Sequence, residues 1–179
     1  DKLWRAGPTL DGGTFCVGFS KSGIGGDKTE NVIGAGFMDY WVMKLDASGN
    51  IEWQNTIGGS KDDFCLDGHA TSDGGYILAG HSKSNISGDK TENTLGLFEN
   101  NDMWIVKLNS TGGIEWQNTI GGLHLDYAEI IRELPDGSFI VAGNSSSAIG
   151  YDKTVDLHGT GGLTYDIWVL KLTSTGSII

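Results

Sequence analysis

Three short loops of the sequence place side-chain oxygens at alternate positions. They read GDKTEN from Gly26, GDKTEN from Gly88 and YDKTVD from Tyr151. Ligands at positions 1, 3 and 5 of a loop can converge on a hard cation, as they do at the start of a calcium-binding loop. A further carboxylate stands at the end of each loop. The candidate calcium ligands are Asp27, Thr29, Asn31 and Asp39 in the first loop, Asp89, Thr91, Asn93 and Asp102 in the second, and Asp152, Thr154, Asp156 and Asp166 in the third.

These loops are not EF-hands. Position 6, where an EF-hand needs glycine, holds Val32, Thr94 or Leu157, and the bidentate glutamate of position 12 is also missing. Asp, Asn and Thr also bond readily to nearby backbone groups and cap turns. The pattern therefore leaves three readings open, which are turn capping, a calcium site and contact with an external ligand.

A second acidic position, filled by Asp1, Asp63 and Asp126, precedes a predicted strand in each part of the chain. Because it recurs, we interpret it as structural, holding the connection into that strand. Trp41, Trp104 and Trp168 also recur, which favours a place in the core over a sugar-binding platform. The four histidines do not recur and show no zinc-ligand spacing. We find no nucleophile elbow, phosphate-binding loop or other catalytic signature.

The elements that must position these residues come from an internal repeat of about 63 residues. Three anchors recur in order along the chain. They are DGGTFCVG, DGGYILAG and DGSFIVAG; then DYWVMKL, DMWIVKL and DIWVLKL; then GNIEWQNTIGG and GGIEWQNTIGG, with a third copy that begins at Gly176. We assign the repeats to residues 1–59, 60–122 and 123–179 of one continuous repeat domain.

Each repeat is predicted to form four antiparallel strands. In the second copy these are 64–70, 76–81, 103–109 and 114–120, joined by glycine-containing turns that need positive φ. The third strand is apolar on both faces, which indicates burial between sheets, and the fourth alternates as a half-exposed outer strand does. We therefore predict an all-β fold of four-stranded blades of the β-propeller type. The third blade is incomplete, and three blades are fewer than the 4–8 that usually close a propeller.

Composition excludes several classes of function. The formal net charge of −11 disfavours nucleic acid and anionic membranes, and no apolar run is long enough to span a bilayer. The two cysteines, Cys16 and Cys65, align with apolar positions of the other repeats and are interpreted as core residues. The chain begins inside a repeat without a methionine, so we expect a segment of a longer protein.

The run DYWVMKLDASGNIEWQNTIGGSKDDFCLDGHATSDGGYILAG resembles a repeat of large secreted and cell-surface bacterial proteins. The resemblance covers nearly the whole chain. It implies propeller-like blades, an extracellular or cell-surface location, and company with adhesion or sorting modules. It implies no particular activity, because a fold does not determine function.

From this sequence we expect a non-enzymatic extracellular module that acts as a binding or adhesion scaffold, with loops that calcium would stiffen. Its expected partners are a protein or glycan ligand, or further copies of the chain that complete a ring or stack. Two alternatives stay open. One is part of a propeller enzyme, of hydrolase or lyase type, whose site lies mostly outside this segment. The other is a structural protein that polymerises through open repeat faces.

Overall fold

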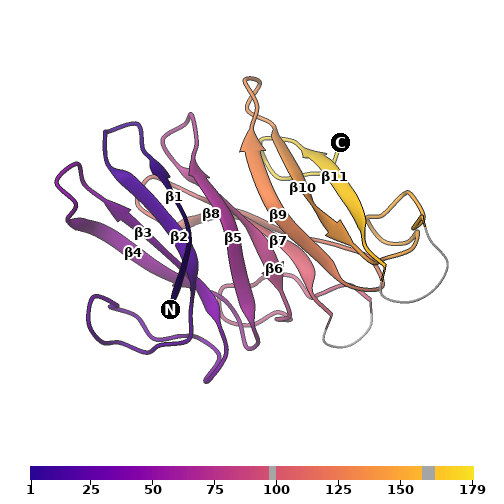
Figure 1. Cartoon of the computed structure of the whole chain (residues 1–179), viewed down its shortest axis with the longest axis horizontal. Coiled ribbons are helices and arrows are strands. Elements are labelled where there is room, and N and C mark those ends of the chain that lie inside the picture. The colour runs from indigo at the N-terminus through magenta and orange to yellow at the C-terminus, as the bar shows by residue number, and fades with distance from the viewer. Residues whose placement is uncertain (97–99, 159–163) are drawn as a thin grey trace.

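The computed structural model describes residues 1–96, 100–158 and 164–179. This part of the chain forms eleven strands in three antiparallel sheets and contains no helix. No described segment is an apolar helix of membrane-spanning length. The chain is therefore all-β, as predicted, and is built of tandem blade-like units (Figure 1).

Each sheet is a simple meander in which every strand pairs with the next one along the chain. Each also lies within one of the three repeats. Sheet 1 contains β1 (Lys2–Pro8), β2 (Thr14–Ser20), β3 (Asp39–Leu45) and β4 (Ile51–Ile57); sheet 2 contains β5 (Asp63–Ala70), β6 (Tyr76–Ser82), β7 (Asp102–Leu108) and β8 (Ile114–Ile120); sheet 3 contains β9 (Asp126–Glu133), β10 (Phe139–Ser145) and β11 (Asp166–Leu172). In the third repeat an isolated β-bridge joins Leu172 to Ile178, the pair equivalent to Leu45 with Ile51 and Leu108 with Ile114.

The hairpin turns follow from glycine and aspartate. Between β5 and β6, Gly74 has a φ of +85°, a conformation that residues with a side chain rarely adopt. Asp73 Oδ1 caps this turn by accepting hydrogen bonds from the Gly75 amide at 2.9 Å and from the Thr71 hydroxyl at 2.5 Å. The equivalent first glycine of each such turn has a similar positive φ, so the repeated Asp-Gly motif is explained by turn geometry.

The first strand of every sheet carries a β-bulge at the same repeat position, next to Trp4, Leu66 or Glu129. The neighbouring strand has a glycine opposite the bulge. In sheet 2, a Cβ on Gly80 would overlap the Phe64 carbonyl oxygen, and Gly18 and Gly143 are crowded in the same way. The glycine that ends the first sequence anchor is therefore required by the bulge rather than by a turn.

The core lies between the sheets. The third strand of sheet 2, β7, is buried along its whole length. Its Trp104, Val106 and Leu108 pack against sheet 1, whereas Met103 and Ile105 pack against sheet 3. The predicted two-faced burial of this strand is confirmed. The outer strand β8 is half-exposed, also as predicted.

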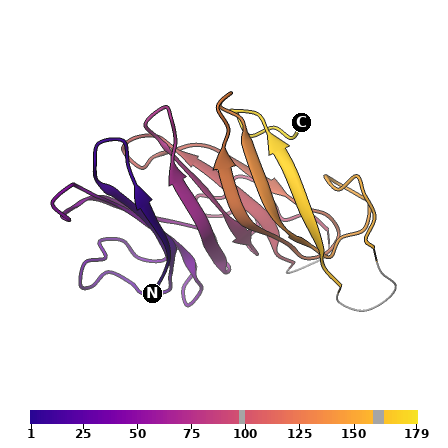
Figure 2. The same cartoon turned by 45° about the horizontal axis from the view of Figure 1, so that its top comes forward.

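The first strands β1, β5 and β9 lie at one edge of their sheets and run side by side in the same direction (Figure 2). We call this the inner edge. The short turns between first and second strands and between third and fourth strands lie at one end of the molecule. The long loops between second and third strands lie at the other end (Figure 1). Whether such units close into a propeller stays a prediction.

Candidate functional site

The side-chain oxygens of the candidate calcium loops are used in different ways. Asn31 Oδ1 accepts a hydrogen bond from the Ile24 amide at 3.0 Å, which closes its own loop. Asn93 and Asp156 make the equivalent contacts in the second and third loops. These contacts are turn caps, as one reading of the sequence proposed.

Other residues of the loop bind it to the outer strand of the same sheet. In the second repeat, Glu92 Oε2 accepts a hydrogen bond from the Thr119 amide at 2.6 Å. The Thr91 amide donates to Gln117 Oε1 at 3.2 Å. Lys90 Nζ contacts the Thr119 hydroxyl and lies 5.0 Å from the centre of the Trp104 ring. The Asp-Lys-Thr-Glu segment is thus a strap over strand β8, and the first repeat uses Lys28 and Glu30 in the same way.

Each strap contains a buried lysine, which is a candidate functional residue because buried lysines are unusual. The sequence analysis did not single it out. Lys28, Lys90 and Lys153 are all buried, and each lies over the tryptophan ring of its own repeat. Burial lowers the pKa of Lys90 to about 8, although Asp63 and Asp102 favour its charged form. Its recurrence in all three loops was the available signal.

The carboxylates at the loop ends, Asp39 and Asp102, are fully buried. Asp39 Oδ2 accepts a hydrogen bond from the Ile33 amide at 2.6 Å, and Asp102 Oδ2 accepts one from the Leu95 amide at 2.5 Å. Burial raises the pKa of each carboxyl group to about 7. Asp166, which is less buried, accepts in the same way from the His158 amide at 2.6 Å.

The remaining oxygen of Asp39 lies against a repeated pair of glycines in the connection between sheets. A Cβ on Gly58 would overlap Asp39 Oδ1, and a Cβ on Gly59 would lie 2.5 Å from Ser84 Cβ in the next sheet. Asp89 Oδ2, from the loop of the next repeat, accepts a hydrogen bond from the Gly58 amide at 3.2 Å. Gly121 and Gly122 repeat this arrangement between sheets 2 and 3.

The second acidic position holds the same connection from the other side. Asp63 Oδ2 accepts a hydrogen bond from the Gly59 amide at 2.7 Å and another from the Ser84 hydroxyl at 3.0 Å. Asp126 does the same with Gly122 and Ser147. Burial raises the pKa of Asp63 to about 6. The predicted structural role of this position is confirmed for Asp63 and Asp126.

The candidate calcium ligands are therefore spread over several places. Asn31, Asn93 and Asp156 close their own loops. Asp39, Asp89, Asp102 and Asp152 face a connection between two sheets, and Thr91 lies in the strap over β8. Among the residues that the structure describes, no three His, Cys, Asp or Glu side chains come together as a metal-binding group. Calcium binding stays a prediction for these loops.

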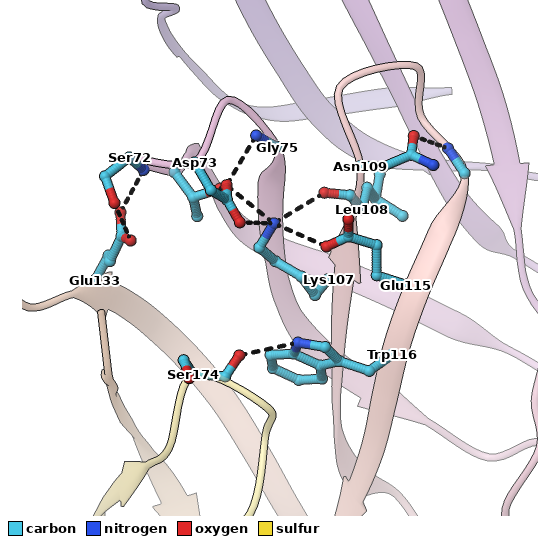
Figure 3. Close-up of polar contacts among 12 residues, drawn as sticks. Ser72, Asp73, Gly75, Lys107, Leu108, Asn109, Glu115, Trp116, Glu133 and Ser174 are labelled. Carbon is cyan, nitrogen blue, oxygen red and sulfur yellow. Dashed lines mark hydrogen bonds and ion pairs between the residues drawn. The ribbon is translucent and has the colours of Figure 1, made fainter. Parts of the chain in front are cut away.

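The opposite end of the units has its own repeated contact, shown for sheet 2 in Figure 3. Lys107 Nζ is buried, and it lies 2.9 Å from Asp73 Oδ2 in one turn and 3.2 Å from Glu115 Oε2 on the outer strand. It also donates to the Leu108 carbonyl at 3.1 Å. In sheet 1, Lys44 binds Asp11 and Glu52 in the same way. The lysine of the second sequence anchor therefore ties a turn to an outer strand.

The outer-strand tryptophans join one sheet to the next. Trp116 Nε1 donates to the Ser174 carbonyl at 3.1 Å, and its ring crowds Gly176 in the following sheet (Figure 3 shows the first contact). Trp53 crowds Gly112 in the same way. In these repeats the recurrent tryptophans are packing residues.

One charged cluster does not follow the repeat. Buried Asp67, on β5, contacts residues from three sheets at the inner edge. Its Oδ1 lies 3.1 Å from Arg5 Nε on β1 and 3.1 Å from His69 Nε2 on β5. Its Oδ2 lies 2.5 Å from Arg132 Nη1 on β9 and accepts a hydrogen bond from the Ile131 amide at 2.9 Å. We call Arg5, Asp67, His69 and Arg132 the inner-edge cluster.

The inner-edge cluster carries excess positive charge. Burial alone would raise the pKa of Asp67, but hydrogen bonds from His69, Ile131 and Arg132 outweigh it and hold the pKa at about 2, so the carboxylate is ionised at neutral pH. Two guanidinium groups surround this one carboxylate, and their side chains stay 44% and 43% exposed. The cluster is thus locally cationic in a chain whose formal net charge is −11.

Sequence reasoning missed this cluster because it ranked residues by recurrence. Arg5, Asp67 and Ile130 occupy one repeat position, and Gly7, His69 and Arg132 occupy another. The usable signal was the reverse of recurrence, namely a position on the first strand whose residue changes charge between repeats.

No family model matches the chain. No curated protein matches it either.

Proposed function

We propose that this chain is a non-enzymatic, extracellular repeat scaffold whose inner edge binds an anionic group of a ligand. The observation that carries the proposal is the inner-edge cluster. The repeated polar residues are occupied in straps, turns and connections between sheets. Arg5, His69 and Arg132 instead face a shared, partly exposed edge where three units meet. The extracellular location rests on the resemblance of the repeat to bacterial surface proteins.

The chemistry of the cluster suits an oxyanion. A guanidinium group presents a planar fork of N–H donors that matches carboxylate, sulfate or phosphate. Arg5 meets Asp67 through Nε, and Arg132 does so through Nη1. Within the described chain, the other guanidinium nitrogens of both residues make no further contact with a carboxylate. Asp67 holds the two side chains in place, so less conformational entropy is lost when a ligand binds.

The enzyme alternative rests on the same cluster, because it pairs a histidine with an aspartate. His69 donates to Asp67 through Nε2, so this ring nitrogen carries a proton and has no lone pair with which to act as a base. The nearby Cys65 thiol is buried, and burial raises its pKa far above the ordinary value, which makes it a poor nucleophile. We therefore favour binding over catalysis for the chain as it stands.

Titration with sulfate and with citrate, against chloride at equal ionic strength, tests this function. We expect both oxyanions to shift the Arg5 and Arg132 guanidinium NMR signals in a saturable way. We expect Arg5→Gln to weaken the binding at least about fivefold, as loss of a charged hydrogen bond predicts.

Lys2→Gln is the matched control, since it removes a positive charge from the same strand without touching Asp67. It should leave binding unchanged. If Lys2→Gln lost as much anion affinity as Arg5→Gln, the effect would be due to net charge and not to the inner-edge cluster. The absence of saturation at millimolar anion would contradict the proposed function.

A further inference from the structure

The two apolar faces of each sheet are different and complementary. One face, which we call the knob face, packs on the following sheet; in sheet 1 it carries Tyr40 on β3. The other, the socket face, packs on the preceding sheet; in sheet 2 it carries Cys65 and Trp104. The same division holds between sheets 2 and 3, where Met103 is the knob and Ala128 belongs to the socket. Two internal junctions therefore use one rule.

The junction between sheets 1 and 2 shows what a filled socket contains. Tyr40 Oη donates a hydrogen bond to the Trp104 carbonyl at 3.0 Å, and the two rings lie 4.9 Å apart. A Cβ on Gly80 would stand 2.7 Å from this hydroxyl, so glycine leaves the room that Tyr40 fills. Cys65 packs in the same core cluster as Tyr40. The knob is fully buried there.

Sheet 1 presents the same socket without a knob. A cavity of about 110 Å³ is lined by Asp1, Leu3, Gly18 and Trp41. These are the repeat equivalents of Asp63, Cys65, Gly80 and Trp104, and the last three of these pack around Tyr40. Met43, in the same wall, corresponds to buried Val106.

Sheet 3 presents the matching knob without a socket. Ile167 on β11 occupies the repeat position of Tyr40 and Met103, yet its side chain is 81% exposed. Val169, two residues on along the same face, is 57% exposed, whereas its equivalents Val42 and Ile105 are fully buried. An exposed apolar surface of this kind marks an interaction site.

We propose that the knob face of sheet 3 binds the socket face of sheet 1 in a second copy of this chain, with Ile167 entering the cavity between Leu3, Gly18 and Trp41. The contact is head-to-tail and reproduces the geometry of the two internal junctions. If two copies bind each other at both ends, they bring together six units, which lies within the range that closes a propeller. If closure fails, the same contact builds an open chain.

The contact is expected to be weaker than an internal junction. At each internal junction the two sheets are joined by a covalent connection, and a buried carboxylate binds the glycine pair of that connection. The contact between two copies has no such connection. We therefore expect association in roughly the micromolar range, with little dependence on salt because the contact is apolar.

Sedimentation velocity of the 179-residue chain between about 1 and 500 µM tests the proposal. We expect a concentration-dependent shift from one copy to two or more. Ile167→Arg and Leu3→Glu, both at exposed positions, should each leave the fold intact and abolish the shift. Ile24→Arg, an equally apolar exposed position on a loop, is the control and should associate like the parent chain.

Mixing the two variants gives the sharpest readout. At one junction of the mixed pair, the cationic side chain of Ile167→Arg meets the anionic side chain of Leu3→Glu. At the other junction, the unchanged Ile167 of one copy meets the unchanged Leu3 of the other. We expect the mixture to regain the association that each variant alone has lost. A chain that stays a single copy at every concentration, or an Ile167→Arg variant that still associates, would overturn the proposal.

Discussion

At the scale of single residues, most residues of the repeated motifs make contacts that join one sheet to the next. Gly121 shows this clearly, because it is not a turn residue with positive φ. A Cβ there would overlap Asp102 Oδ1. Asp102 is held in place by the Leu95 amide, so neither partner has room to withdraw.

We predict that Gly121→Ala destabilises the chain by about 1–3 kcal/mol, the usual cost of forcing an extra methyl group into a packed site. For a protein of this size this corresponds to a fall in melting temperature of roughly 2–12 °C. Thermal unfolding followed by circular dichroism measures it. Gly25→Ala is the control, since a Cβ there meets nothing within 4 Å. An equal loss in both variants would show that the Asp102 contact is not the cause.

Recurrence in the sequence was a good guide to some residues and a poor guide to others. It predicted that Asp63 and Asp126 hold the connection between sheets, and the Gly59 and Gly122 contacts confirm this. It could not assign Asp67, whose partners Arg5 and Arg132 lie one repeat away on either side. Contacts of that kind depend on how neighbouring sheets are placed, which no local pattern records.

At the scale of elements, strands and turns were predictable because their causes are local. Alternating apolar residues set the strands, and glycine with positive φ set the turns. The bulges at Trp4, Leu66 and Glu129 were not predicted, because a bulge is a property of two paired strands. Gly80 was a signal of the bulge at Leu66, but it was interpreted only as the last residue of the repeated DGGYILAG motif.

Lys107 gives a prediction at this scale, because it ties the turn between β5 and β6 to strand β8 (Figure 3). Lys107→Met keeps the aliphatic stem and removes the charge. We expect it to lower the free energy of unfolding by about 1–3 kcal/mol, because Asp73 and Glu115 lose a buried partner. Urea unfolding measures the change.

Lys171→Met is the matched variant. Lys171 makes the equivalent contact with Asp136 at 3.1 Å, but it is 38% exposed. An exposed pair of this kind contributes about 0–1 kcal/mol. We therefore expect a clearly smaller effect in Lys171→Met. Equal effects would mean that burial of Lys107 does not matter.

At the scale of the whole molecule, buried charges run from sheet to sheet through the junctions. Lys28 lies near Asp39, Asp39 near Asp63, and Asp63 near Lys90. This series of neighbouring charges continues through Asp102 and Asp126 to Lys153. Burying so many charges is costly unless they are paired or protonated. The junctions should therefore respond to pH together.

The direction of that response follows from the carboxylates. Burial raises the folded-state pKa of Asp39 and Asp102 to about 7 and that of Asp63 to about 6. The folded state therefore binds more protons than the unfolded state between about pH 4 and pH 7, so stability falls as pH rises through this window. His81, whose pKa burial lowers to about 4, acts in the opposite direction up to about pH 6.5, but it is one group against three.

Below pH 4 the sign reverses. Hydrogen bonds and nearby cations hold the pKa of Asp67, Asp73 and Asp136 at about 2. Stability that depends on their ionised forms is lost as pH falls from about 4 toward 2. We therefore predict a stability maximum near pH 4–5, with a melting temperature at least about 5 °C lower at pH 8.

Asp102→Asn isolates the cause. The amide oxygen can still accept the hydrogen bond from the Leu95 amide, but the side chain no longer ionises. Its melting temperature should fall less between pH 5 and pH 8 than that of the parent chain. Asp27→Asn, at an exposed loop position, should keep the parent slope. Scanning calorimetry at a series of pH values decides the matter. A parent chain that gains stability from pH 5 to pH 8, or an Asp102→Asn variant with an unchanged slope, would show that the buried carboxylates do not govern how the sheets hold together.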